Sequence, residues 1–263
     1  MITEYHRPEK LEDALALLGR SNLLSLPLGG GTVLTQPESH LRTSMLTDGA
    51  SFAVIDLQAL GLDKISRSGR NLIVGATVRL QSLLAESDLP AALRQAIQLE
   101  ASVNLRQAAT LAGSLVSADG RSPLATVLLA LDADVTIQSD GEQQQVYGLG
   151  DLLPLRADLL CGKLITSLSF SQQVKTAYAY AARTPADRPV VCAALAQWPS
   201  GRVRLALGGF GVLPQLVLDG PEPGGLEIAA RNAFAYAGDQ WASAEYRSAA
   251  AAELAIRCLE NLN

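Results

Sequence analysis

Residues 109–116 read ATLAGSLV, and residues 122–131 read SPLATVLLAL. The first stretch places small residues where the backbone can approach a ligand closely. The second predicts a helix with Ser122 as its N-cap and Pro123 at its first position. A helix that begins in this way leaves backbone N–H groups free at its N-terminus, and such an end attracts phosphate. The two stretches therefore predict a site for a phosphate group.

A glycine run follows the strand predicted at residues 23–28, because residues 29–32 read GGGT. Three glycines let the backbone come close to a ligand and can form a nest of N–H groups for an anion, although a glycine run after a strand is often only a turn. The run is not a dinucleotide fingerprint, because Leu34 stands in place of the third glycine. No Gly-Lys-Ser/Thr follows it either, so a nicotinamide Rossmann domain and a P-loop enzyme are both disfavoured.

The composition is that of a folded globular protein, since 48% of the 263 residues are hydrophobic. This length is enough for two domains, or for one large domain with lobes. A net charge of -5 and the lack of a Lys/Arg cluster argue against nucleic acid as a partner. No apolar run reaches the ~18 residues of a membrane span, and the first residues do not resemble a signal peptide. We therefore expect no nucleic acid, no membrane span and a cytoplasmic location.

The cysteines and histidines do not suggest a metal site. The three cysteines, Cys161, Cys192 and Cys258, contain no Cys-x-x-Cys pair, so we interpret them as small buried side chains rather than ligands of zinc or an iron–sulfur cluster. The two histidines, His6 and His40, lie among polar or turn-forming neighbours. We expect both at the surface, neither binding a metal nor linking a flavin.

Hydrophobic periodicity predicts an α+β protein. Helices are predicted at residues 11–18, 80–85, 89–105, 124–131, 226–237 and 244–262, and strands at 23–28, 53–57, 72–74, 135–137, 145–147, 164–170, 174–182, 190–198 and 203–207. Ile65 and residues 72–74 flank a predicted hairpin turn at 68–71, and the strands at 135–137 and 145–147 form a second predicted hairpin around residues 140–141. In the helix predicted at residues 89–105, Leu93, Ile97, Ala101 and Leu105 form a stripe that we assign to core packing. We expect two N-terminal lobes, residues 1–54 and 55–162, and a small C-terminal α+β domain with an antiparallel sheet, residues 163–263.

Several segments, in the same order along the chain, resemble the FAD subunits of molybdenum hydroxylases, the xanthine dehydrogenase and carbon monoxide dehydrogenase family. The second flavin motif of that family reads roughly RxxATIGGN and then LLALDA, and here residues 106–114 read RQAATLAGS and residues 128–133 read LLALDA. The family's AGGTDL corresponds to GGGTVL at residues 29–34. Further matches are YHRP at 5–8, DL at 56–57, VGATV at 74–78, RTPADR at 183–188 and ASAEYR at 242–247.

The resemblance implies a fold of the PCMH type, similar to vanillyl-alcohol oxidase, in which FAD binds noncovalently between two N-terminal lobes. Both glycine loops would hold the pyrophosphate, and the isoalloxazine would face a cleft toward the C-terminal domain. No residue of this chain need be catalytic, and Arg121 is either a further contact or a solvated side chain. The implied FAD-binding residues are Leu28, Gly29, Gly30, Gly31, Thr32, Val33, Leu34, Ala109, Thr110, Ala112, Gly113, Ser114, Val116, Ser122 and Ile165.

Four residues depart from the family pattern at the implied site. Val33 replaces an Asp, Ala112 the first Gly and Ser114 the Asn of the second motif, and Pro123 stands where an Asp often follows Ser. Each lost hydrogen bond weakens FAD binding by ~1–2 kcal/mol.

The resemblance and these departures leave three hypotheses. In the first, the chain is an electron-transfer subunit whose FAD receives electrons from a molybdopterin-binding large subunit, through a 2Fe–2S small subunit, and passes them to NAD or another acceptor. In the second, the chain is a structural subunit that has lost FAD. The third, a stand-alone flavin oxidase, is disfavoured, because the chain lacks a substrate-cap domain and a His or Cys placed to link the flavin.

Overall fold

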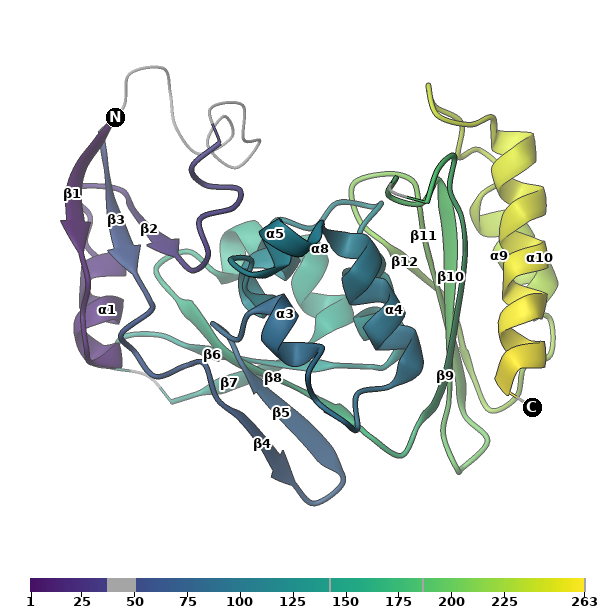
Figure 1. Ribbon diagram of the computed structural model, residues 1–263, viewed down its shortest axis with the longest axis horizontal. Coiled ribbons are helices and arrows are strands. Elements are labelled where there is room, and N and C mark those ends of the chain that lie inside the picture. The colour runs from purple at the N-terminus through teal and green to yellow at the C-terminus, as the bar shows by residue number, and fades with distance from the viewer. Residues whose placement is uncertain (37–50, 142, 186, 263) are drawn as a thin grey trace.

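The structure, a computed structural model, describes residues 1–36, 51–141, 143–185 and 187–262 (Figure 1). The expectation for His40 and the match at Ala186 lie outside these residues. Within the described part of the chain, the strands form sheets of three, five and four strands. The sheets follow one another along the long axis of the molecule, and a layer of helices separates the second sheet from the third (Figure 1).

The N-terminal sheet is parallel, with strand order β1-β3-β2. Its elements are β1 (Ile2–His6), α1 (Leu11–Leu18), β2 (Ser25–Leu28) and β3 (Phe52–Asp56). The central strand β3 is buried along its whole length, and α1 packs Ala14, Leu15 and Leu18 into the adjoining core. The sequence did not predict β1, because the side chains of this edge strand are mostly exposed and show no hydrophobic pattern.

The second sheet is antiparallel, with strand order β4-β5-β8-β6-β7. Its strands are β4 (Ile65–Ser68), β5 (Asn71–Gly75), β6 (Asp134–Gln138), β7 (Gln145–Gly148) and β8 (Leu164–Ser171). The two predicted hairpins, β4–β5 and β6–β7, are confirmed and form the two edges of the sheet.

Strand β8 pairs with β5 and β6, between the two hairpins. The C-terminal domain was expected to begin at residue 163, but this pairing places the next strand in the sheet of the second lobe. The sequence could not distinguish the two arrangements, because a strand has the same period-two pattern in either sheet. A boundary after Ser171 agrees better with the pairing, and the division into three units stays a prediction.

The helices between the second and third sheets are α3 (Leu80–Leu83), α4 (Ala91–Glu100), α5 (Val103–Arg106), α6 (Leu111–Val116), α7 (Pro123–Ala130) and α8 (Leu149–Leu159). All residues of α7 are buried, because it contacts other helices and also β10 and β11 of the third sheet. This position explains its uninterrupted apolar sequence. Helix α8 was not predicted; Pro154 lies inside it, and an internal proline removes one of the helix's hydrogen bonds.

The single helix expected at residues 89–105 is wrong, because the chain is extended at Ala101 and forms α4 and α5 instead. Arg106 stabilises this break: its guanidinium donates to the carbonyl oxygens of Gln98 (3.0 Å) and Ala101 (2.6 Å), which would otherwise lack partners at the helix end. Leu93 and Ile97 of the predicted stripe are buried, whereas Leu105 is exposed. The stripe is therefore correct only in α4.

The third sheet is antiparallel, with strand order β12-β11-β10-β9. Its strands are β9 (Lys175–Ala181), β10 (Val191–Gln197), β11 (Val203–Gly208) and β12 (Gln215–Gly220), and α9 (Leu226–Ala233) and α10 (Ala244–Leu262) follow. One face of β10 packs on the middle helices and the other on α9 and α10. The predicted α+β fold with an antiparallel C-terminal sheet is confirmed.

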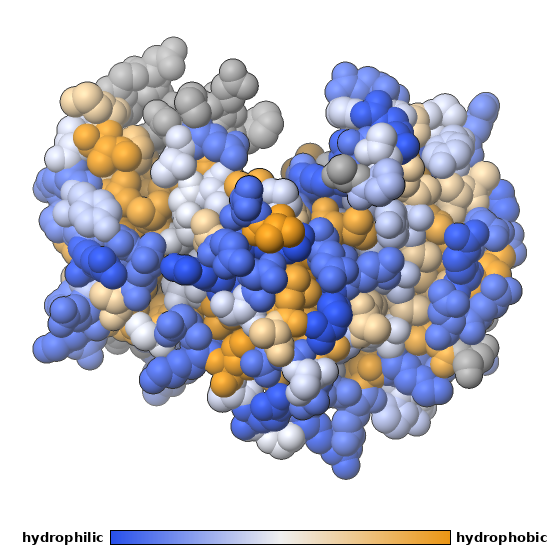
Figure 2. All heavy atoms as spheres, viewed as in Figure 1, coloured by the Kyte–Doolittle hydropathy of each residue, from blue (hydrophilic) through white to orange (hydrophobic). Residues whose placement is uncertain are grey.

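The molecule is hollowed between the N-terminal sheet and the third sheet, above the middle helices (Figure 2). The loop after β2 reaches toward this hollow from one side, and the upper ends of β10 and β11 border it on the other (Figure 1). The fold thus places the first glycine loop across a cleft from the C-terminal domain.

Candidate functional site

The two glycine-containing segments singled out in the sequence lie against each other. A Cβ atom on Gly30 would stand 1.9 Å from the carbonyl oxygen of Ala108, and one on Gly29 would stand 2.7 Å from Oγ1 of Thr110. Glycine is therefore required at position 30 because two backbones touch there. The structure brings together two loops that are about eighty residues apart in the sequence.

The loop after β2 has free hydrogen-bond donors. The backbone N–H groups of residues 29–34 donate to no acceptor among the described residues. Unpaired N–H groups are uncommon in half-buried segments such as this one. Gly31 has a φ of 71°, which favours glycine. Successive N–H groups at such a turn form a concavity for an anion, so this loop fits a pyrophosphate.

The second segment uses its own N–H groups within the fold. The N–H of Leu111 donates to the carbonyl of Val78 (2.9 Å), and the N–H of Ala112 donates to the carbonyl of Ala76 (3.1 Å). The segment 74–78, which the sequence analysis matched to the family, is thus the support on which the second motif rests. These two N–H groups are not free for a phosphate, in contrast to the expectation that both loops supply donors.

Helix α6 begins inside this second motif, and Thr110 is its N-cap. The Oγ1 atom of Thr110 accepts a hydrogen bond from the N–H of Gly113 (3.3 Å), and its carbonyl accepts one from the N–H of Ser114 (2.9 Å). Gly113 is exposed and Ser114 is half-buried. The second motif therefore offers a ligand the uncovered surface of Gly113 and the Ser114 hydroxyl.

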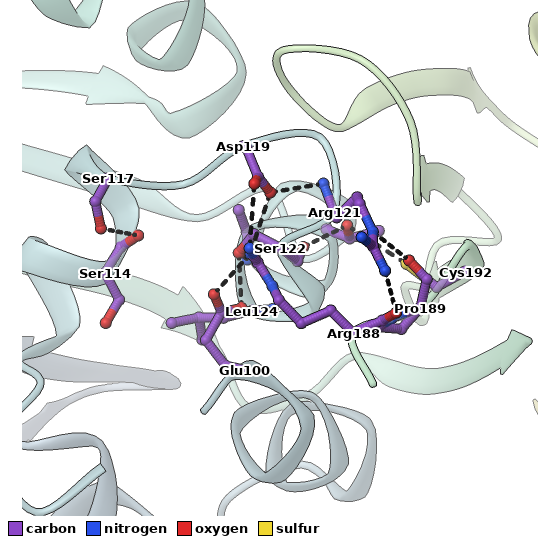
Figure 3. Close-up of polar contacts among 12 residues, drawn as sticks. Glu100, Ser114, Ser117, Asp119, Arg121, Ser122, Leu124, Arg188, Pro189 and Cys192 are labelled. Atoms are coloured by element: carbon purple, nitrogen blue, oxygen red, sulfur yellow. Dashed lines mark hydrogen bonds and ion pairs between the residues drawn. The ribbon is translucent and has the colours of Figure 1, made fainter. Parts of the chain in front are cut away.

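Ser122 is the N-cap of α7, as predicted, but it does not face a ligand site. Its side chain is completely buried. An Oε2 atom of Glu100 lies 2.7 Å from the Ser122 hydroxyl and 3.0 Å from the N–H of Leu124 (Figure 3). The protein's own carboxylate thus occupies the helix end at which we expected a phosphate. The assignment of Ser122 to FAD binding is corrected on this ground.

Glu100 was not identified from the sequence, because no local pattern links it to Ser122, 22 residues away. Burial raises the pKa of its carboxyl group, while the nearby cation of Arg188 lowers it. The Nη2 atom of Arg188 lies 3.3 Å from Oε1 of Glu100. Arg188 therefore helps this carboxylate to stay charged at the end of α7.

Arg121 turns away from the glycine loops. Its guanidinium donates to the carbonyl oxygens of Pro189 (3.1 Å) and Arg188 (2.5 Å). It also lies over the Trp241 ring, 4.6 Å from the ring centroid. Of the two interpretations left open for Arg121, neither holds, because the side chain joins the middle helices to the C-terminal domain.

Val116 and Ile165 line one small apolar crevice between α6, α8 and β8. Ile165 is buried, and Val116 is half-buried. Ala109 is buried beside the loop contact, and Pro123 is buried at the first position of α7. Among these residues, Val116 is the one with part of its surface uncovered.

The described residues contain no cluster of three or more His, Cys, Asp or Glu side chains able to hold a metal ion. Cys192 and Cys258 are buried as expected, whereas Cys161 is exposed, so that expectation is wrong for Cys161. His6 is partly exposed and lies 2.8 Å from a carboxylate oxygen of Glu4. In the described part of the chain, we find no helix with the length and apolar character of a membrane span.

Residues 29–34, whose N–H groups have no acceptor among the described residues, pack on a second small-residue motif, and this arrangement fits a protein that binds an anionic cofactor. Residues 1–170 match the family described as the FAD binding domain in molybdopterin dehydrogenase. YgfM of Escherichia coli K12, described as uncharacterized, is 31% identical over 212 residues, which are 80% of this chain and 75% of YgfM. The chain belongs to this family of FAD-binding domains.

Two relatives have more specific names. The glyceraldehyde dehydrogenase medium chain of Sulfolobus acidocaldarius is 28% identical over 217 residues, which are 78% of this chain and 74% of that protein. The 6-hydroxypseudooxynicotine dehydrogenase complex subunit alpha of Paenarthrobacter nicotinovorans is 31% identical over 177 residues, which are 64% of this chain and 57% of that protein.

Solved structures share the fold over nearly the whole chain. A chain of the Cu,Mo-CO dehydrogenase in its cyanide-inactivated form has a TM-score of 0.79 and 22% identity, covering 99% of this chain and 97% of that one. A chain of quinoline 2-oxidoreductase from Pseudomonas putida 86 has a TM-score of 0.77 and 20% identity, covering 98% and 96%. The predicted family, fold and FAD cofactor are confirmed, and the chain is an FAD-binding subunit of the molybdenum hydroxylase family, a family of oxidoreductases.

Proposed function

We propose that this chain is the electron-transfer subunit of a molybdenum dehydrogenase complex. Electrons would reach its FAD from a molybdopterin-binding large subunit through a 2Fe–2S small subunit, and would pass to NAD or another acceptor. Two relatives support this proposal by their names, since one is a medium chain and the other a subunit of a dehydrogenase complex. Bound FAD supplies the redox chemistry, and the protein sets its position and surroundings.

The observation that carries the proposal is the set of free N–H groups at residues 29–34. We infer that they hold the pyrophosphate without a basic side chain. The second motif then supplies the surface of Gly113, the hydroxyl of Ser114 and the Thr110 cap that fixes both. The proposed FAD contacts are Leu28, Gly29, Gly30, Gly31, Thr32, Val33, Leu34, Ala109, Thr110, Ala112, Gly113, Ser114, Val116 and Ile165, without Ser122.

A separate iron–sulfur subunit fits the cysteine content of the chain. A cluster of this kind commonly has four cysteine ligands, whereas the sequence has three cysteines. Two of the three are buried, one in β10 and one in α10. We therefore assign the one-electron donor to another polypeptide.

The test is to purify the full-length chain from its native host and, separately, after expression alone. We expect a yellow protein that releases FAD rather than FMN, accompanied in the host by an iron–sulfur and a molybdenum subunit. A colourless chain that takes up no added FAD would favour the structural-subunit hypothesis. A lone chain with substrate oxidase activity would favour the stand-alone oxidase.

A further inference from the structure

The turn between α6 and α7, residues 117–122, is enclosed by the C-terminal domain. The N–H of Gly120 donates to the carbonyl of Gly211 (3.1 Å), and the N–H of Gly209 donates to the carbonyl of Gly120 (2.7 Å). A Cβ atom on Gly120 would lie 2.0 Å from the carbonyl oxygen of Phe210. The loop between β11 and β12 therefore fixes the backbone of this turn on one side.

Arg188 holds the same turn from a second side. Its guanidinium lies 3.1 Å from the carboxylate of Asp119, within the turn, and 3.3 Å from that of Glu100 (Figure 3). Arg121, also in the turn, donates back to the carbonyl oxygens of Arg188 and Pro189. Each arginine thus binds the segment from which the other arises. The contact joins the segment 188–189 of the C-terminal domain to the middle helices.

The turn continues directly from α6. The N–H of Ser117 donates to the carbonyl of Gly113 (3.1 Å), and its hydroxyl donates to the same carbonyl (2.8 Å). A shift of the turn is therefore transmitted to the two α6 residues, Gly113 and Ser114, that we assign to FAD. At its other end the turn meets Ser122 and the Glu100 carboxylate, whose charge Arg188 offsets.

We propose that Arg188 is a positioning residue of the FAD site, acting from the C-terminal domain through Asp119 and Glu100 on the turn that follows α6. It does not touch the cofactor in this scheme. Without it, the buried Glu100 carboxylate loses its cationic partner beside the turn, and α6 loses part of its support. This inference rests on the proposed function, because it assumes that α6 contacts FAD.

The experiment measures FAD affinity of the full-length chain by titration of flavin fluorescence, with visible circular dichroism of the bound flavin as a second signal. We expect Arg188→Gln to weaken FAD binding about tenfold or more and to change the flavin dichroism. Arg188→Lys keeps the charge and should restore part of the affinity. Glu100→Gln added to Arg188→Gln removes the uncompensated charge and should also recover affinity.

Arg202→Gln is the matched control, because Arg202 also joins the C-terminal domain to α7. Its guanidinium pairs with Asp132 (2.9 Å), just after the opposite end of that helix. We expect its FAD affinity to stay within twofold of the wild type, even if its melting temperature falls as much as that of Arg188→Gln.

Several results would overturn the inference. One is an Arg188→Gln chain that binds FAD within twofold of the wild type, and another is an equal loss of affinity in the Arg202 variant. If Arg188→Gln does not fold, Asp119→Asn takes its place, and we expect it to weaken FAD at least threefold; unchanged affinity there would also overturn the inference. A wild-type chain that binds no FAD would instead refute the proposed function itself.

Discussion

Gly30 lies directly against the carbonyl group of Ala108, since a Cβ atom at position 30 would stand 1.9 Å from that oxygen. The contact fixes the loop that carries the free N–H groups onto the segment that leads into α6. The two halves of the proposed FAD site therefore depend on one backbone-to-backbone approach. Gly113 differs, because among the described residues a Cβ atom there would meet a side-chain atom rather than a backbone, namely Oγ1 of Thr110 at 2.8 Å.

We predict that Gly30→Ala lowers both stability and FAD affinity. The methyl group forces the two backbones apart, which we expect to cost about 1–3 kcal/mol of unfolding free energy. FAD binding should weaken about tenfold, which corresponds to about 1.4 kcal/mol. Urea unfolding and flavin titration measure the two effects.

Gly113→Ala provides the comparison within the same site. The added Cβ displaces the Thr110 cap, but alanine favours the helix more than glycine does, so the two effects offset each other and stability should change by less than about 1 kcal/mol. FAD affinity still falls, because the added methyl covers the exposed surface of α6. Gly224→Ala is the neutral control, because the nearest atoms to its Cβ lie 3.6 Å away or more. Equal destabilisation by Gly30→Ala and Gly113→Ala would contradict the conclusion that position 30, unlike position 113, needs glycine for a contact between two backbones.

The buried Glu100 carboxyl group predicts a pH dependence of stability. Its pKa is raised by burial above the ordinary value of 4.5. Between that value and the raised one, the folded state binds more protons than the unfolded state, so this group makes stability fall as pH rises through the window. Glu100→Gln should abolish this part of the slope. Unfolding free energies of the two proteins, measured from pH 4.5 upward, test it, and parallel curves would contradict it.

Arg247 ends the segment 242–247, which resembles the family, and its contacts show that this segment stabilises the fold. It is completely buried in the first turns of α10, and it donates to the carbonyl oxygens of Val190 (3.0 Å) and Ala237 (2.6 Å) and pairs with Asp239 (2.8 Å). These bonds tie α10 to the residue before β10 and to the loop after α9.

We predict that Arg247→Ala lowers the unfolding free energy by about 3–5 kcal/mol, because it leaves buried carbonyls and a carboxylate without their partner. Arg257→Ala, on the same helix, removes an exposed pair with Glu253 at 3.7 Å and should cost less than about 0.5 kcal/mol. Denaturant titrations of the two variants provide the measurement. Similar losses in both would show that the buried contacts of Arg247 contribute little.

The features that were predicted correctly are those that depend on residues close together in the sequence. Ser122 and Pro123 start α7 as a cap and a first-position proline should, and the apolar run of β10 forms a strand buried on both faces. The resemblance, rather than any spacing, indicated that residues 29–34 and 109–116 meet. Local patterns thus sufficed for many elements, whereas the pairing of the two loops followed from the resemblance.

The features that were missed depend on partners distant in the sequence. The end of α7 looked open, because nothing near Ser122 reveals that Glu100 fills it. Arg121 looked solvated or ligand-bound, because its acceptors lie 67 and 68 residues away. Strand β12 was missed because its side chains are mostly exposed or half-buried, which weakens the hydrophobic pattern.

A substitution at Ser114 should increase the affinity for FAD. Asn is usual at this position in the family that the sequence resembles, and the shorter Ser side chain is half-buried on α6, beside the exposed Gly113. An added side-chain amide on α6 should supply a contact to FAD that the wild type lacks, because the Ser114 hydroxyl reaches less far than the amide of an asparagine. We predict that Ser114→Asn tightens FAD binding by about 1–2 kcal/mol, or roughly tenfold.

Ser117→Asn is the control for this change, because the Ser117 hydroxyl already donates to the carbonyl of Gly113 (2.8 Å) within the turn. There the longer side chain replaces a structural hydrogen bond and should not increase affinity. Isothermal titration with FAD compares the two variants with the wild type. If Ser114→Asn leaves the affinity unchanged while Gly30→Ala lowers it, the cofactor contacts the first loop and not the α6 surface, and the second motif serves only to support that loop.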